Sequence, residues 1–366
     1  MTLAMALMAL TLAAPGEPEF TPLLDGESLA GWTATGDESG WVVEDDGILL
    51  TVGTVDGGWL ATDREYADFV LRLEYMLSEV GNSGVLVRGM AEGSVVTEVQ
   101  LLAPWTPRRD DLHCTGSLYG HVAVDPRPDE TPLVWHSMEI TAVGKLLTVS
   151  VDGVEVCRAN TDEVESLAGA SLSGKIALQS SHSGPDEWVR FRNIRIRDLD
   201  AEPGHLAYQL RDEDPAIRRH AQEFAARLGT AMVPELLRLH AEGTPLSVAT
   251  ASEALAWVAA HATKEDGSGG ALSAALAREL AADWPAQTRK LALEMLAIAG
   301  GEDAIPPIAA SMPHPDLSFS AAAALAAIGG DAARSALNEA IGGDSRDAEI
   351  AAAIALGSMG AGKALG

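Results

Sequence analysis

Two polar residues that lie two positions apart, Glu98 and Gln100, have the types and spacing suited to acid–base or ligand-binding chemistry. Because side chains alternate between the faces of a β-strand, both point to one face while Val99 and Leu101 point to the other. A carboxylate can act as a general base or bind a metal ion, and an amide can bind ligand oxygens. The same pattern is ordinary on a solvated strand, so these residues alone leave a structural role open.

Four further side chains can exchange or donate protons, namely His113, Tyr119, His136 and His182. An imidazole changes its charge near neutral pH, and a phenol can donate a proton to a departing oxygen. A lone histidine is more often structural than catalytic. Position alone therefore assigns none of the four a role.

Candidate binding residues are Asn82, Arg88 and Gln179. Asn82 lies between glycines, where an asparagine is most often a turn former. Arg88 has many acidic residues with which it could pair, because the chain carries a formal net charge of −28. A guanidinium also binds the oxygens of a ligand or of an oxyanion. Both readings stay open from the residues alone.

These residues lie in a part of the chain, from Phe20 to about Asp200, that has the periodicity of β-strands. Alternation and β-rich runs predict strands over 69–75, 84–88, 97–101, 137–143, 146–151, 175–179 and 189–196. In the last of these the apolar phase slips, which predicts a β-bulge near Arg192-Asn193. Many short strands with no helical period between them predict an antiparallel β-sandwich or a barrel.

After residue 200 the composition changes to Ala, Leu and Glu with helical spacing. A unit of two to three helical turns that ends in a small residue recurs at 217–229, 248–260, 288–300, 317–329 and 348–360. Such a recurrence predicts stacked helical hairpins, and it resembles short HEAT-type repeats. We therefore expect a multidomain β plus α protein with a sandwich over 17–200 and a short α-solenoid over 201–366.

The first 16 residues form a separate segment. Residues 1–14 read MTLAMALMALTLAA, an apolar run with the length of a signal-peptide core, and it ends in small residues. It lacks the usual basic residue in front, so a buried or disordered N-terminal segment is the alternative. We expect residues 1–16 to be a signal peptide and the protein to be exported to the periplasm or the extracellular space.

Composition excludes several functional classes. A net charge of −28 opposes binding to nucleic acid or to an anionic membrane. Two cysteines, Cys114 and Cys157, are too few for a disulfide scaffold or a cysteine-based zinc module, and the two can form one disulfide or stay free. No apolar run is long enough to cross a bilayer. No phosphate-binding loop or serine-hydrolase motif is present.

Several motifs together resemble the 3-keto-disaccharide hydrolase domain family. They are residues 24–32 (LDGESLAGW), 41–47 (WVVEDDG), 68–75 (DFVLRLEY), 81–88 (GNSGVLVR), 98–102 (EVQLL), 115–120 (TGSLYG), 135–136 (WH) and 190–196 (RFRNIRI). The resemblance covers about half of the chain. It implies a concanavalin-like jelly roll of two antiparallel sheets, one of them facing a sugar.

The resemblance also implies a reaction on glycosides that are already oxidised at C3. The C3 ketone acidifies the hydrogen on C2, so a modest base can remove it and the enolate then expels the C1 substituent. The product is a 3-keto-2-hydroxy-glucal, and its hydration is the companion reaction. This chemistry requires a base, an acid and a group that stabilises the enolate. It needs no carboxylate pair at the spacing used in ordinary glycoside hydrolysis.

Site roles follow from the resemblance. It implies a catalytic set of Glu98, His136, His182 and Tyr119, with Glu98 as general base or metal ligand, and a substrate-binding set of Arg88, Gln100, Asn82, Trp105, His113 and Gln179. The family commonly has Asn where this chain has His136, which puts the role of that residue in doubt. Trp105 is flanked by two prolines, so we expect it on a loop, where its ring can stack on a sugar face. We expect the other tryptophans, Trp32, Trp41, Trp59 and Trp135, in the sandwich core.

Alternatives remain for function, metal and partners. The rival function is a non-catalytic carbohydrate-binding or scaffolding protein, in which the sandwich is a lectin-like module and the repeats bind another protein. Oxygen ligands for a divalent metal are available in Asp125, Asp129 and Glu130, but they lack an EF-hand spacing, so a metal cofactor stays open. We expect a 3-keto-glycoside or another carbohydrate as the ligand, and no nucleic acid.

Overall fold

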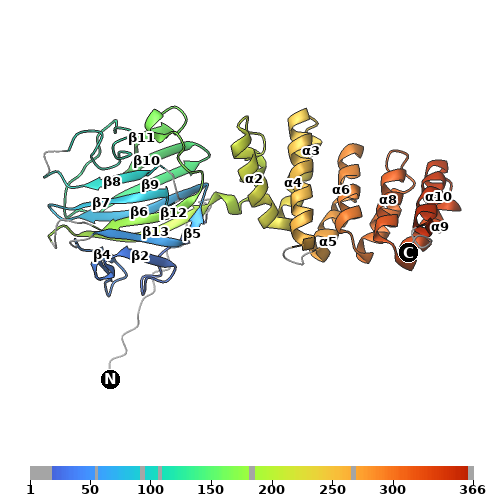
Figure 1. Ribbon diagram of the computed structural model, residues 1–366, viewed down its shortest axis with the longest axis horizontal. Helices are drawn as coiled ribbons and strands as arrows, with labels where there is room; N and C mark the ends of the chain where they lie inside the picture. Colours follow the sequence, from blue (N-terminus) through green and yellow to red (C-terminus); the bar gives the residue numbers. More distant parts are fainter. Residues whose placement is uncertain are drawn as a thin grey trace, which may run out of the picture. The chain divides into compact units, whose positions relative to one another are not determined.

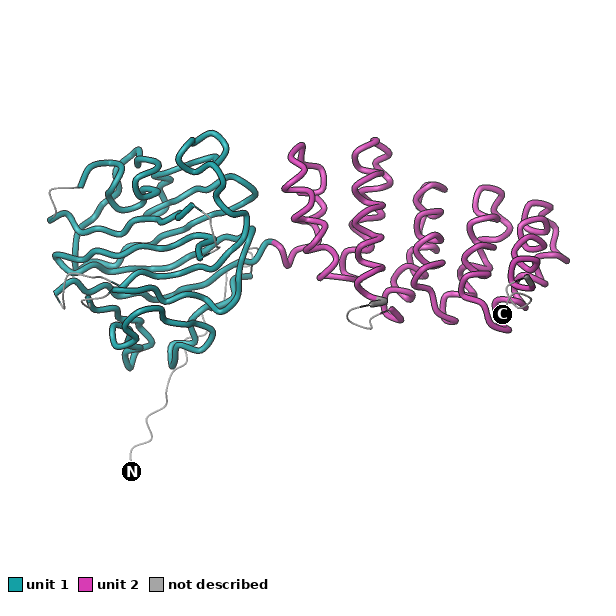
Figure 2. The backbone as a smooth tube through the Cα atoms, in the orientation of Figure 1, with its two compact units in different colours: residues 1–199 teal, residues 200–366 magenta. Residues whose placement is uncertain are grey.

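The structure is a computed structural model that describes residues 19–53, 57–90, 95–105, 109–180, 186–264 and 269–361. Figure 1 shows strands in the first part of the chain and helices in the second. The chain divides into two compact units, residues 1–199 and 200–366 (Figure 2). His182 and the predicted signal peptide lie outside the described residues.

The first unit is an antiparallel β-sandwich. Its eight-stranded sheet has the order β11-β10-β9-β6-β13-β4-β3, with β1 also paired to β13, and its five-stranded sheet has the order β2-β5-β12-β7-β8. The strands of the larger sheet are β1 (Thr21–Pro22), β3 (Trp41–Val43), β4 (Leu49–Thr51), β6 (Phe69–Leu77), β9 (His136–Val143), β10 (Leu146–Val151), β11 (Val154–Asn160) and β13 (Val189–Asp198). The smaller sheet contains β2 (Trp32–Gly36), β5 (Gly58–Tyr66), β7 (Asn82–Gly89), β8 (Glu98–Leu102) and β12 (Gly174–Ser180).

The sandwich core forms because alternate residues of both sheets are apolar. β6 buries every second side chain, with Phe69, Leu71, Leu73, Tyr75 and Leu77 at most 2% exposed. Each fully buried residue of this size contributes roughly 1.5–3 kcal/mol relative to exposure. This alternation confirms the predicted strand and fixes which face of each strand is turned away from the core.

The predicted β-bulge is present in β13. The pairing between β13 and β6 shifts register between Arg192 and Arg195. Asn193 has a φ of 53°, in the left-handed region that asparagine tolerates better than most residues. The bulge lets Phe191 and Ile194 both point into the core despite their odd spacing.

The second unit consists of helices. Its α-helices are α1 (Pro203–Gln209), α2 (Pro215–Leu228), α3 (Val233–Ala241), α4 (Pro245–Lys264), α5 (Gly269–Glu279), α6 (Ala286–Ala299), α7 (Ile305–Ser311), α8 (Ser318–Ile328), α9 (Gly330–Ile341) and α10 (Arg346–Ala361). The five predicted recurring units correspond to α2, α4, α6, α8 and α10, which follow one another in a row (Figure 1). One continuous core of mostly Ala and Leu joins the helices of this unit. Their assignment to HEAT-type repeats stays a prediction.

None of the helices within the described ranges is long and apolar enough to cross a membrane.

Candidate functional site

The outward face of the five-stranded sheet gathers most of the predicted polar site residues. On β8, Val99 and Leu101 are fully buried in the sandwich core, so Glu98 and Gln100 are directed to the opposite face. On β12, Leu178 is buried in the core, which directs Gln179 outward. We call this surface the Glu98 face.

Glu98 is the side chain on this face with the most perturbed chemistry. Its Oε1 atom is buried and has no hydrogen-bond partner. Burial raises the pKa of Glu98 from 4.5 to about 7, because the charged carboxylate loses hydration that no donor replaces. A carboxylate with this pKa exchanges a proton near neutral pH, as a general base must.

The Glu98 carboxyl group packs over a glycine of the neighbouring strand. Gly84 of β7 faces Gln100, and Leu86 faces Glu98, in the antiparallel register. A Cβ atom at Gly84 would lie 2.0 Å from Oε1 of Glu98, so only a glycine leaves the space that the carboxyl group occupies. This glycine lies in the predicted Gly-Asn-Ser-Gly motif, whose role is therefore partly steric.

An amide pair lies beside Glu98. Nε2 of Gln100 donates a hydrogen bond to Oδ1 of Asn82, at 3.1 Å. Gln100 is buried and Asn82 is half-buried, so the pair is fixed while the amides face the same surface as the carboxylate. Two amides offer both donors and acceptors for the hydroxyl groups of a ligand.

An apolar platform completes the face, and it corrects the expectation that Trp59 lies in the core. Trp135, which was also expected there, is half-buried and outside the core cluster. Trp59 packs against Ala61, Leu86 and Ala177 in a small cluster separate from the sandwich core. Trp59 thus lies on the outward face, paired with Gln179 in the sheet register, and not in the core. The sequence Gly-Trp-Leu-Ala at residues 58–61 could have predicted the outward direction of Trp59. Leu60 is the core residue, so its neighbours on the strand must point outward.

Tyr119 lies on the same face as Glu98. The segment that contains Tyr119 extends the sheet beyond β8 through a bridge between Val99 and Leu118. The backbone N–H of Tyr119 donates to the carbonyl of Glu98 at 2.9 Å, and antiparallel pairing sets the two residues opposite each other. Tyr119 is 43% exposed as a residue, so a ligand can approach it.

His113 supports Tyr119 from the side. The two rings pack edge to face with their centroids 5.0 Å apart. Nδ1 of His113 lies 2.7 Å from Oδ1 of Asp110, and this hydrogen bond lowers the pKa of the Asp110 carboxyl group. The structure therefore groups Asp110, His113 and Tyr119, of which the sequence patterns missed Asp110. The remaining loop residue, Trp105, is 51% exposed, on the loop that follows β8.

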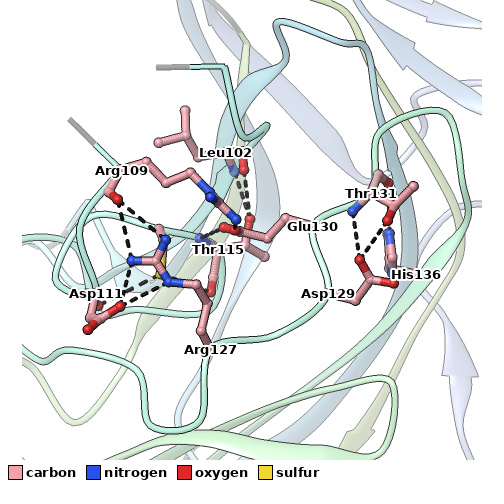
Figure 3. Close-up of polar contacts among 10 residues, drawn as sticks. Leu102, Arg109, Asp111, Thr115, Arg127, Asp129, Glu130, Thr131 and His136 are labelled. Carbon is pink, nitrogen blue, oxygen red and sulfur yellow. Dashed lines mark hydrogen bonds and ion pairs between the residues drawn. The ribbon is translucent and has the colours of Figure 1, made fainter. Parts of the chain in front are cut away.

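A buried carboxylate fixes the long segment that carries these residues. Glu130 accepts a hydrogen bond from the backbone N–H of Thr115 at 3.0 Å and pairs with Arg109, and its side chain has no exposure. Figure 3 shows Glu130 reaching toward both partners, while Arg127 contacts Asp111 and the Arg109 carbonyl. The ion pairs connect chain positions on either side of Tyr119, so they restrict the loop that holds it.

Arg88 is not part of the site, contrary to the predicted substrate-binding role. Its side chain is 4% exposed and its guanidinium donates to the carbonyls of Ala67 and Gly144 and to Oδ1 of Asp68. These three contacts tie β7 to the segment before β6 and to the turn between β9 and β10 in the other sheet. The residue is thus a buried structural cation with a buried counter-ion.

His136 also does not lie beside Glu98, because it is the first residue of β9 in the eight-stranded sheet. Its ring is buried and stacks on Tyr75, with Nδ1 2.7 Å from Oδ2 of Asp152. Its Nε2 lies 2.9 Å from the carbonyl oxygen of Thr131 (Figure 3). Burial alone would lower the pKa of His136, but the bonds to Asp152 and Thr131 outweigh it and raise the pKa. Both ring nitrogens are occupied, so the predicted catalytic role is replaced by a structural one.

Other predicted ligands have internal partners as well. Asp129 accepts from the backbone and the hydroxyl of Thr131 with its Oδ1, and Glu130 is bound as described. Cys114 and Cys157 are both free and buried. Burial raises the pKa of Cys114 to about 11, which keeps the thiol protonated and unreactive at neutral pH.

Comparison with known proteins supports a carbohydrate-active protein. Residues 19–197 match the family model of the 3-keto-alpha-glucoside-1,2-lyase-like domain, which confirms the resemblance found in the motifs. No protein with a curated description matches the chain.

Three solved structures are similar in the same region. A "putative glycosyl hydrolase" from Parabacteroides distasonis is 24% identical, with a TM-score of 0.43, covering 50% of this chain and 100% of that one. A second "putative glycosyl hydrolase" from this organism is 27% identical, with a TM-score of 0.39 and coverages of 49% and 83%. A carbohydrate-binding module from Bacillus subtilis is 14% identical, with a TM-score of 0.32 and coverages of 45% and 93%.

Proposed function

We propose that the β unit, which carries the match to the 3-keto-alpha-glucoside-1,2-lyase-like domain, cleaves 3-keto-glycosides by elimination. The observation that carries the proposal is the Glu98 carboxyl group, with one oxygen buried and unpartnered and a pKa of about 7. It lies on a face that combines an apolar platform with amide groups, the composition that binds a sugar ring.

In the proposed reaction, the Glu98 carboxylate removes the hydrogen on C2. The electrons of the C2–H bond form the enolate, whose negative charge rests on the C3 oxygen. The C3 carbonyl then re-forms, a double bond forms between C1 and C2, and the bond from C1 to the leaving oxygen breaks. Tyr119, opposite Glu98, donates the proton to that oxygen.

The amide pair has a separate role in this mechanism. The Asn82 and Gln100 amides lie beside the base, where their N–H groups can donate to the C3 oxygen as its charge develops. Water added across the C1–C2 double bond would give the free 3-keto-sugar, so elimination followed by hydration amounts to hydrolysis. A deuterated solvent would place deuterium at C2 in that product.

The test is release of nitrophenol from p-nitrophenyl 3-keto-glucoside by the full chain, with and without a chelator. Glu98→Gln removes the base and should abolish release, and loss with the chelator alone would indicate a metal. Glu155→Gln is a matched control, because Glu155 is exposed on β11 and pairs with Arg158. Release by Glu98→Gln at the wild-type rate would refute the assignment of the base.

The second candidate is carbohydrate binding without catalysis, favoured by the apolar platform around Trp59. It predicts that the full chain binds methyl glucoside, that Trp59→Ala weakens this binding, and that Glu98→Gln does not. Absence of nitrophenol release from folded wild-type protein that binds the sugar would favour this candidate.

A further inference from the structure

A hollow lies on the eight-stranded sheet, opposite the sheet that carries Glu98. It has a volume of about 310 Å³ and opens on the outward face of β6, β9, β10 and β13. Its polar lining residues are Arg72, Glu74, Ser137, Glu139, Ser150 and Arg195. Leu73 and Met138 also line it, but their side chains are buried in the core, so their backbone forms the floor. We call this feature the outer-sheet hollow.

The hollow exists because two small residues, Ser137 and Ser150, lie among long side chains on neighbouring strands. Arg195, Arg72, Glu139 and Ser150 lie in one row across β13, β6, β9 and β10. Glu74 and Ser137 face each other one row further along β6 and β9. Long side chains form the walls and the two serines leave the space between them. The feature thus results from which strands are neighbours, and not from a loop.

The walls are held in place by ion pairs. Nε of Arg72 lies 2.6 Å from Oε2 of Glu139. Glu74 accepts hydrogen bonds from Arg192 and Asn193, each at 2.7 Å. These contacts orient both carboxylates before any ligand arrives, which reduces the entropic cost of binding.

One aromatic ring, that of Phe20, supports both cations of the lining. The guanidinium of Arg72 lies 4.4 Å from the Phe20 ring centroid, and that of Arg195 lies 5.8 Å from it. Within the part of the chain that the structure describes, Arg195 forms no ion pair, so its donors are available to a ligand.

The charge balance of the lining selects the ligand class. Two guanidinium groups and two carboxylates sum to zero, and two hydroxyls join them. The carboxylates oppose an anion and the guanidiniums oppose a cation, whereas a neutral polyol can donate to the former and accept from the latter. The volume is at the lower end of ligand pockets, about 300–1,000 Å³, which suits one ring.

We propose that the outer-sheet hollow is a second carbohydrate site, which binds a neutral sugar ring on the sheet opposite the Glu98 face. The site does not depend on the proposed elimination reaction, since none of its residues belongs to the Glu98 face.

The experiment is photolabelling of the full chain with a neutral glucoside whose aglycone carries an aryl diazirine, followed by peptide mapping. We expect label on residues 135–153 and 189–197, and excess methyl glucoside should remove it. Ser150→Trp fills the hollow and Arg195→Ala removes a donor. Each should reduce this label by about tenfold, equivalent to ~1.4 kcal/mol of binding.

Three controls separate the sites. The diazirine aglycone without sugar is the first control. Any labelling of these strands by it should not be reduced by excess methyl glucoside. Glu98→Gln should leave the label unchanged, so failure of the proposed catalysis and failure of this site are distinguishable. Label on 135–153 that survives both excess methyl glucoside and Ser150→Trp would overturn the proposal. Stronger competition by a glucuronide than by the glucoside would also overturn it.

Discussion

The carboxyl group of Glu98 occupies the space that a side chain at Gly84 would fill. A Cβ at that position would lie 2.0 Å from Oε1 and 2.8 Å from the carboxyl carbon. The two residues are on neighbouring strands and in adjacent rows of the same face, so the smallest residue of one strand sets the position of the most perturbed carboxylate of the other.

Gly84→Ala should therefore displace the carboxyl group. Once it moves toward solvent, the pKa of Glu98 should fall from about 7 toward 4.5, and the acid limb of the kcat/KM profile should move to lower pH. We expect a loss of about 100-fold at pH 8, since misplacement by about 1 Å has this effect. Gly204→Ala is the control, because nothing lies within 4 Å of that position. An unshifted pH profile would contradict the steric role.

Glu98→Gln should stabilise the fold above pH 7. The pKa of Glu98 is raised in the folded state, so this state binds more protons than the unfolded chain between pH 4.5 and about 7, and wild-type stability falls as pH rises through that window. At about 1.4 kcal/mol per pKa unit, the variant should gain up to ~3 kcal/mol above pH 7 and nothing below pH 4.5. Urea unfolding at pH 4.5 and 8 measures the difference. Equal gains at both values would show that the carboxyl group is not buried.

Tyr119→Phe should slow elimination most for poor leaving groups. A general acid contributes about 100-fold to 10,000-fold when the leaving oxygen is basic, and little when it is a nitrophenolate. The ratio of kcat for an alkyl and a nitrophenyl 3-keto-glucoside reports this difference. Tyr208→Phe is the matched control, as this exposed tyrosine lies in the helical unit. Equal loss for both substrates would remove Tyr119 as the acid.

Arg88→Met should affect folding more than chemistry. Removing one member of a buried ion pair, here the Arg88 guanidinium beside Asp68, typically costs about 3–5 kcal/mol. We expect a lower Tm and an unchanged kcat/KM per folded molecule at low temperature. A rise in KM with normal stability would instead restore the substrate-binding role that the motif suggested.

Glu130→Gln should loosen the loop that carries Tyr119. The substitution keeps an acceptor for the Thr115 N–H but removes the charge paired with Arg109. We expect a loss of about 2–3 kcal/mol, below the full cost of a buried pair because Arg109 is 26% exposed. Hydrogen exchange should increase across residues 109–122. For Glu155→Gln, an exposed pair, the change should stay below about 1 kcal/mol.

The sequence predicted strands β6, β7, β8, β9, β10, β12 and β13, the bulge and the outward direction of Glu98 and Gln100, because alternation reports which face a side chain takes. It did not predict β1 to β5 or β11. The same rule applied to Leu60 would have put Trp59 outside the core. Alternation does not report where a long side chain ends. Arg88 lies in β7, in a motif that was matched to the site, yet its guanidinium reaches the carbonyl of Gly144, a contact between residues 56 positions apart.

The hydrogen-bond partners of His136 could not be predicted from the sequence for a related reason. Its two partners are Thr131, in the segment before β9, and Asp152, in the turn between β10 and β11, and only the folded sheet brings both to the ring. Asp110 was missed because an acidic residue near a histidine is common in a chain with 53 Asp and Glu residues. Its hydrogen bond depends on the turn that the segment forms.

The strand that carries Glu98 is the last in its sheet, and the segment with Tyr119 covers its open side. Gln100 donates its backbone N–H to the carbonyl of Ser117, and Tyr119 donates to that of Glu98. An uncovered edge strand is a template for pairing with another chain. Damage to this segment would thus have two effects at once, because it would displace Tyr119, the proposed acid, and expose an edge strand prone to aggregation. Soluble yield is for that reason a necessary companion measurement for every variant of residues 109–122.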